Sequence, residues 1–81
     1  MKAKIVVTLK EGVLDPQGEA IRRALGKMGY QSVDQVRQGK YFELDFDAGS
    51  TESEVRSKTE EIAAKVLSNP IIEGFKIEEI Q

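Results

Sequence analysis

The sequence predicts one α+β domain over residues 1–81, a ferredoxin-like two-layer sandwich with two helices on one face of an antiparallel sheet. Three observations lead to this prediction. Apolar residues recur with the period of two that is typical of strands near the start, in the middle and towards the end of the chain. Two stretches with helical periodicity separate these runs, and each begins with a capping signal. The resulting order, β-α-β-β-α-β, is that of two split β-α-β units.

A strand and a helix come first in this order. Residues 3–9 are rich in β-branched side chains and alternate between two faces, which indicates a strand. A helix is expected over residues 16–28. Asp15 can accept hydrogen bonds from free N–H groups at its start, and Pro16 fits the first helical position, where no N–H is needed. Gly29 can take the left-handed conformation that ends the helix.

One side of this first helix is apolar, because its apolar residues recur three and four positions apart. They are Ala20, Ile21, Ala24, Leu25 and Met28. Gly18 lies in the first turn, although glycine in a helix costs about 0.5–1 kcal/mol relative to alanine. A helix start alone does not account for that glycine.

Two adjacent strands are predicted in the middle of the chain. Residues 41–47 alternate between apolar and acidic positions, as in a strand with one buried face. A shorter and less regular run, residues 33–37, precedes them, and a bulge near Gln35 would bring its two valines into phase. Gly39 follows Gln38 between the two runs and can supply the positive φ of a tight hairpin turn. The two runs are therefore expected to form an antiparallel hairpin.

The second helix has a clear start and end. Thr51 and Glu54 form a capping box, and the helix is expected to stop near Ser68 because Pro70 cannot continue it. Its predicted inward face comprises Val55, Thr59, Ile62, Ala63, Val66 and Leu67.

A last strand is predicted over residues 71–80, with a possible bulge at Gly74. The sheet face without helices is expected to carry apolar residues among charges, and such a strip usually marks a partner surface. These residues are Val6, Thr8, Tyr41, Ile72 and Ile80.

Composition narrows the possible classes of function. The chain has a formal charge of −2 and contains neither Cys nor His. Disulfides and the usual zinc sites are therefore excluded, and the commonest general base and the best nucleophile are missing. No basic patch suggests nucleic acid, and no apolar run is long enough to cross a membrane. No signal peptide is recognisable, so a cytoplasmic location is expected.

Small size predicts self-association. A domain of 81 residues buries only about 60% of the surface that its unfolded chain exposes, and small domains commonly add disulfides, metals or a partner chain. Since disulfides and the usual zinc sites are excluded, we expect a homodimer or homotetramer without metal or cofactor.

Three short stretches are candidate partner interfaces. The first is Asp15-Pro16-Gln17-Gly18. Capping explains Asp15 and Pro16, but Gly18 is equally consistent with an incidental glycine and with a helix start left bare for another backbone or an anion.

The second and third stretches are the predicted turn and the link to the last strand. Arg37, Gly39 and Lys40 are either an ordinary solvated turn or a basic tip that contacts an acidic partner or a phosphate. Asn69-Pro70 is either a helix stop or a rigid exposed loop placed against a partner. The chemistry of these residues alone favours the ordinary explanation for both.

Three motifs in order resemble the PurS family over essentially the whole chain. They are "GVLDPQGEAI" at 12–21, "VRQGKYFEL" at 36–44 and "LSNPIIE" at 67–73. Ser68 and Gly74 depart from residues common in the family, and neither alters the Asn69-Pro70 turn.

The resemblance implies a role in purine synthesis. PurS is the small subunit of phosphoribosylformylglycinamidine synthase, in which a glutaminase subunit releases ammonia and a large ATP-dependent subunit uses it. The chain is then expected to be a non-catalytic part of this ligase that bridges both partner subunits. A regulatory small-molecule-binding module of the ACT type shares the predicted order and is the alternative. A catalytic ferredoxin-like domain, such as a small isomerase, fits less well because catalytic residues are missing.

Overall fold

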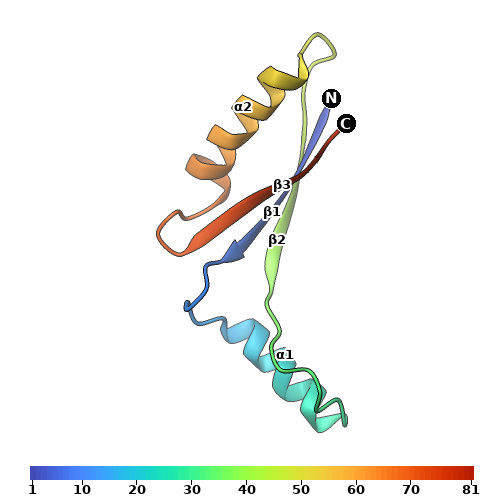
Figure 1. Cartoon of the computed structure of the whole chain (residues 1–81), viewed down its shortest axis with the longest axis vertical. Coiled ribbons are helices and arrows are strands. Elements are labelled where there is room, and N and C mark those ends of the chain that lie inside the picture. The colour runs from blue at the N-terminus through green and yellow to red at the C-terminus, as the bar shows by residue number, and fades with distance from the viewer.

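A computed structural model describes all residues from 1 to 81 and confirms the α+β, ferredoxin-like class (Figure 1). Its elements are β1 (Lys2–Leu9), α1 (Pro16–Lys27), β2 (Gly39–Asp45), α2 (Glu52–Ile62), the π-helix η1 (Ala63–Leu67) and β3 (Glu73–Ile80). The strands form one antiparallel sheet in the order β2-β1-β3. None of its helices is long and apolar enough to cross a membrane.

The core lies between β1 and α2. Alternation along the central strand β1 turns Ala3, Ile5 and Val7 towards the helix, and all three are fully buried. Val55 and Ala63 meet them from the helical layer. Partly buried residues surround this cluster, namely Met1, Phe42, Leu44, Phe46, Leu67, Ile77 and Ile80. Only 7 of the 81 residues are buried, so the core is small for the length of the chain.

The predicted hairpin is wrong at its first strand. Residues 33–37 form no strand, and Gly39 is the first residue of β2 rather than a turn residue with positive φ. Strand β2 pairs with β1, with Gly39 opposite Thr8, so the sheet partner of this region is the first strand of the chain. The two valines of this run are out of phase, so its pattern was only weak evidence for a strand. In the structure no other segment pairs with it.

Strand β3 differs from the prediction in its bulge and its outer face. The register shifts between Lys4 and Ile5 of β1, opposite Glu78, and not at Gly74. Ile80 packs against the core rather than lying on the open face.

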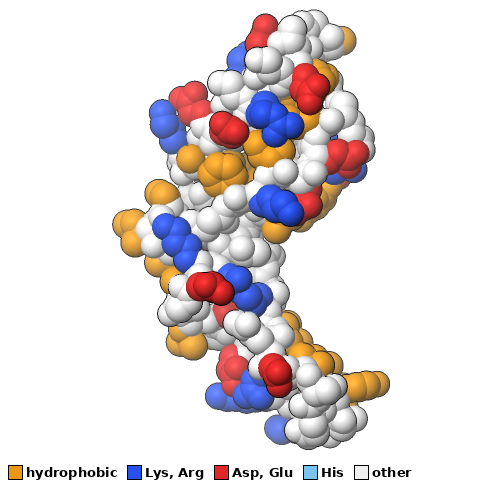
Figure 2. All heavy atoms as spheres, in the orientation of Figure 1, with side chains coloured by type: hydrophobic (Ala, Val, Ile, Leu, Met, Phe, Trp, Pro, Cys, Tyr) orange, Lys and Arg blue, Asp and Glu red, His pale blue; other side chains and the backbone are white.

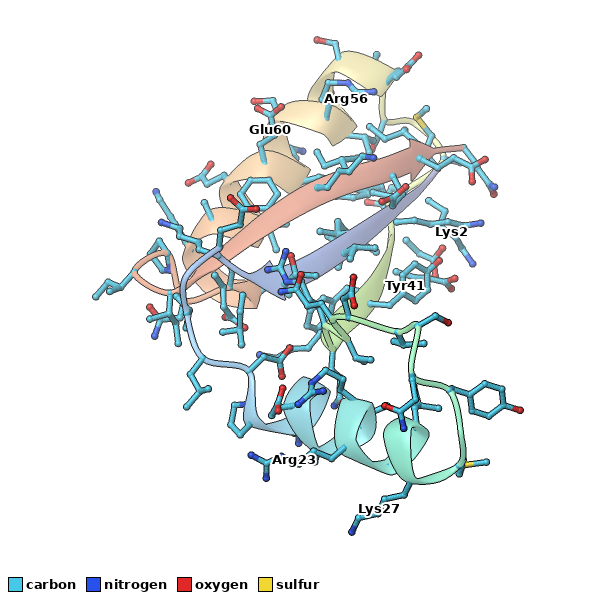
Figure 3. The ribbon with its side chains drawn as sticks, turned by 60° about the horizontal axis from the view of Figure 1, so that its bottom comes forward. Lys2, Arg23, Lys27, Tyr41, Arg56 and Glu60 are labelled. Carbon is cyan, nitrogen blue, oxygen red and sulfur yellow. The ribbon has the colours of Figure 1, made fainter.

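The open face of the sheet is mainly charged, and the predicted apolar strip is present only in part. Val6, Thr8 and Tyr41 lie on this face, with Val6 opposite Tyr41, whereas Ile72 precedes β3 and Ile80 packs on the other face. Lys2 lies 3.2 Å from Glu43, and Lys4 lies 3.4 Å from Glu79. Tyr41 donates a hydrogen bond of 2.8 Å to Glu43, and Figure 3 shows Tyr41 and Lys2 on the same side of the sheet. Side chains of opposite charge on neighbouring strands therefore form ion pairs across this face.

The helix ends follow the predicted caps. Asp15 and Thr51 each accept a hydrogen bond from the backbone N–H three residues later, and Gly29 has a φ of 97°. The second helical stretch ends at Ser68, as predicted, but its last turn is the wider π-helix. A π turn advances each residue by a smaller angle, and Val66 is 75% exposed rather than inward.

Helix α1 lies beyond the end of the sheet, whereas α2 covers the sheet face (Figure 1). The predicted placement of both helices on one face therefore needs correction for α1. We call residues 12–38 the arm, and the sheet with α2 and η1 the body. The molecule measures 51 × 25 × 14 Å, and its radius of gyration is 16.1 Å, against about 12 Å for a compact domain of this length. The apolar side of α1 marks a face to be covered, but its own sheet does not cover it.

Candidate functional site

The predicted interface residues gather where the arm meets the body. The start of α1, residues 15–18, lies beside residues 36–40 at the entry to β2. The turn at Asn69-Pro70 joins the body side through Lys10 and Glu73. The structure thus brings together three stretches that are far apart in the sequence.

Asp15 connects the two arm segments. One carboxylate oxygen accepts from Gly18 N at 2.8 Å, and the other accepts from Gln38 N at 2.9 Å. These two backbone N–H groups, that of Gln38 first, lower the pKa of the Asp15 carboxyl below its usual value, and the charge of Arg37 adds to the effect. The Gln17 and Gln38 side chains form a second link at 2.6 Å. The capping residue therefore also holds a segment 23 positions away.

Gly18 allows a close approach between backbones of the same chain. It is fully buried, and a Cβ atom there would overlap the carbonyl oxygen of Val36. The backbone that approaches this helix start belongs to the chain itself, and not to the partner for which the position is a candidate interface. Ordinary capping explains Asp15 and Pro16, but the glycine is required by the packing of residue 36.

Gly39 is constrained in a similar way. A Cβ atom at this position would lie 2.5 Å from Val7 O and 2.8 Å from Thr8 Cγ2. The glycine therefore lets β2 begin close against β1, which replaces the predicted role in a hairpin turn.

Lys40 and Asn69 meet at Glu73. The Glu73 side chain, 11% exposed, accepts from Asn69 N at 2.7 Å and lies 3.5 Å from Lys40 Nζ. The pKa of the Glu73 carboxyl is lowered, first by the Asn69 N–H and further by the Lys40 charge. Lys10 Nζ donates to Pro70 O at 2.7 Å, which ties the exit of β1 to the same turn. The Glu73 side chain thus links β3 to Lys40 of β2 and to the Asn69-Pro70 turn.

Two hollows lie beside these segments, and most of the residues that line them are polar or charged. One of about 430 Å³ is bordered by Asp15, Gln17, Gln38, Gly39, Lys40 and Glu73, among others. Another of about 640 Å³ is also bordered by Asp15 and includes Arg37. No group of three or more His, Cys, Asp or Glu side chains is placed to hold a metal ion. Such an arrangement orders backbone segments and leaves polar groups exposed at the junction of arm and body.

Sequence reasoning missed the residues that complete this arrangement. Gln38 and Val36 act mainly through their backbone atoms, so no side-chain pattern could reveal them. Lys10 follows the predicted first strand directly, and nothing in its local sequence indicates its contact with Pro70 O. The one available signal was Asp15, because an aspartate cap has a second oxygen that the helix does not use.

Comparisons with known proteins point to one family. A model of the PurS family, described as phosphoribosylformylglycinamidine (FGAM) synthase, matches residues 2–81. Phosphoribosylformylglycinamidine synthase subunit PurS of Bacillus subtilis (strain 168) is 44% identical over 77 residues, which cover 95% of this chain and 89% of that protein.

Two solved structures share the fold over nearly the full length. One is Methanocaldococcus jannaschii PurS, described as one of the subunits of formylglycinamide ribonucleotide amidotransferase in the purine biosynthetic pathway. It is 35% identical with a TM-score of 0.80, and the match covers 99% of this chain and 98% of that one. The other is a chain in the structure of PurLQS from Thermotoga maritima, 26% identical with a TM-score of 0.81, and that match covers 99% of both chains.

Proposed function

Because the chain belongs to the PurS family, whose members are subunits of FGAM synthase in purine biosynthesis, we propose that it bridges the glutaminase and synthetase subunits of that complex. In this role it is not catalytic by itself. It holds the two large subunits so that ammonia released from glutamine reaches the ATP-dependent subunit without escaping to solvent.

The observation that carries this proposal is the match to the PurLQS chain along its full length. A chain that follows a complexed subunit from end to end has the shape needed for the same position in a complex. The family assignment also favours the FGAM synthase role over the ACT-type alternative.

The shape of the molecule supports a bridging role. At 51 Å in its longest dimension, the chain separates its two ends widely for 81 residues. Large apolar side chains are exposed on both parts of the molecule, Met28 and Tyr30 on the arm and Val66 and Ile71 on the body beside the Asn69-Pro70 turn. Figure 2 shows hydrophobic side chains at the surface of the body and at the lower end of the arm. Two separated contact regions are what a bridge between two proteins requires.

The exposed candidate residues are proposed to contact the partner subunits. Pro16, Gln17 and Arg37 lie on the arm side of the junction, and Lys40, Asn69 and Pro70 lie on the body side. Asp15, Gly18 and Gly39 serve the junction from within, so we assign them an indirect part. We also propose that the chain acts as a homodimer or homotetramer in the cytoplasm.

Reconstitution tests the bridging role. The two large subunits are assayed for FGAM formation with glutamine or with ammonium salt as nitrogen source, with and without the chain. We expect the chain to raise the glutamine-dependent rate at least tenfold and the ammonia-dependent rate much less. Equal glutamine-dependent rates with and without the chain would refute the proposal.

A further inference from the structure

The position of the arm is not explained by packing on the body. Helix α1 lies past the end of the sheet, and its apolar residues Ile21 and Met28 are 40% and 70% exposed. Apart from Gly18, every buried residue belongs to β1, α2 or η1. Within one chain, contacts other than a hydrophobic interface must therefore set the angle between arm and body.

Two chain segments connect the arm to the body, one leaving β1 and one entering β2. On the body side both are fixed, because Lys10 donates to Pro70 O and Lys40 pairs with Glu73. On the arm side, the Asp15 carboxylate, the Gln17–Gln38 side-chain bond and the approach of Val36 O to Gly18 hold them together. We call this second group, Asp15, Gln17, Gly18, Val36 and Gln38, the clamp.

We propose that the clamp sets the angle of the arm relative to the body, with Asp15 as its positioning residue. The inference rests on the proposed bridging function for its purpose: a fixed angle keeps the two ends of the chain at the spacing that the two large subunits require. The clamp itself is a property of the isolated chain. Its existence can therefore be tested whether or not the bridging function holds.

Asparagine at position 15 would separate the two roles of the aspartate. Asn keeps an oxygen that can accept from Gly18 N, so the helix cap is retained. Its second group is an NH₂ that would face the N–H of Gln38, donor against donor. Asp15→Asn thus removes the carboxylate link from Asp15 to Gln38, one of the three contacts of the clamp, and leaves the helix cap in place.

The absence of cysteine allows a direct measurement of the arm position. Spin labels are attached through Lys27→Cys on α1 and Glu60→Cys on α2, two exposed side chains that point away from the molecule in Figure 3. Pulsed dipolar spectroscopy gives the distribution of distances between them. Each labelled protein is diluted into excess unlabelled protein carrying the same position-15 residue, so that only distances within one chain are recorded.

We expect the distance between the two spin labels to have one narrow distribution in the parent protein and a distribution at least twice as wide in Asp15→Asn. Asp34→Asn is the matched control, because it makes the same chemical change on the arm at a side chain without a hydrogen bond in the structure, and it should keep the narrow distribution. Gln17→Ala, which removes one side-chain bond at an exposed position, should widen it to a smaller extent and serves if Asp15→Asn does not fold.

The functional half is tested by adding each unlabelled variant to the two large subunits. Asp15→Asn should lower the glutamine-dependent rate severalfold without changing the ammonia-dependent rate, and Asp34→Asn should change neither. A distribution as narrow in Asp15→Asn and Gln17→Ala as in the parent would overturn the clamp. A widened distance distribution together with an unchanged glutamine-dependent rate would overturn the role of the clamp in the complex. If the parent chain itself does not raise the glutamine-dependent rate, the bridging function is refuted, and the distance measurement still decides whether the clamp exists.

Discussion

Gly18 is buried because the Val36 carbonyl oxygen occupies the space where any other residue would have a Cβ atom. Alanine is the better helix former, so helix propensity alone predicts that Gly18→Ala stabilises the protein. The structure predicts the opposite. The added methyl group must displace backbone, and we expect a loss of about 1–3 kcal/mol in the free energy of unfolding, measured by denaturant titration.

Gly26→Ala is the control for this experiment. Gly26 lies in the same helix, and the nearest atoms to an added Cβ are those of Gln31 at 3.9 Å, which is ordinary contact. That variant should gain about 0.5–1 kcal/mol. If both alanine variants were stabilised alike, the close approach of Val36 would be disproved.

Thr59 is a buried residue whose hydroxyl has no hydrogen-bond partner. Burying an unpaired polar group costs about 1–3 kcal/mol, and valine has nearly the same shape without that group. Thr59→Val should therefore raise the free energy of unfolding by about 1 kcal/mol. Thr59→Ser keeps the hydroxyl and loses the methyl group, so it should lower that free energy by about 1 kcal/mol. A loss of stability in Thr59→Val would show that the hydroxyl is paired.

Because of Asp15, the free energy of unfolding should depend on pH in the acid range. Its pKa is lowered from the ordinary value of 3.8 by the N–H groups of Gln38 and Gly18, so the ionised form favours the folded chain. This contribution is complete above the unfolded pKa and is lost as the pH falls through the lower, folded pKa. We expect the stability difference between the parent and Asp15→Asn to shrink below about pH 4. Unfolding series at several pH values measure it, and a constant difference would contradict the assignment.

At the scale of elements, local caps are the most predictable features of this chain. Thr51 Oγ1 accepts from Glu54 N at 3.2 Å and begins α2 where the capping box placed it. Thr51→Ala should cost about 1 kcal/mol of unfolding free energy, because one free N–H of the first turn loses its partner. Ser53→Ala, two residues later in the same first turn and exposed, should change the free energy of unfolding by less than about 0.5 kcal/mol. Comparable losses in both variants would argue against the cap.

Elements that depend on a distant partner were less predictable. The alternation in β2 was recognised, because period two is a property of the strand itself. Residues 33–37 were assigned to a strand wrongly, since pairing depends on which chain segment lies alongside. The same holds for Val66, which has helical spacing but is turned outwards by the π turn of η1.

At the scale of the whole molecule, exposed apolar surface predicts self-association. The arm leaves Ile21, Met28 and Tyr30 at least 40% exposed. We expect analytical ultracentrifugation at micromolar concentration to show a dimer or a dimer of dimers, because covering this surface with a second copy removes apolar area from water. Met28→Lys should weaken the association at least tenfold while the body keeps its fold. A fully folded monomer as the single species of the parent protein would contradict this expectation.

The sequence by itself determined the α+β class, the order of the main elements, the capped ends of both helices and the family. These follow from interactions within about four residues and from patterns that are periodic along the chain. Only the tertiary structure decided that α1 extends away from the sheet and that neighbouring backbone approaches Gly18 and Gly39 closely. The same holds for Glu73, which forms an ion pair with Lys40 and accepts a hydrogen bond from Asn69 N. The bond from Gln38 to Asp15 spans 23 positions and uses a backbone donor that every residue except proline has. A contact made by a common group at long separation leaves no mark in the local sequence, so the junction of arm and body could be recognised only in the folded chain.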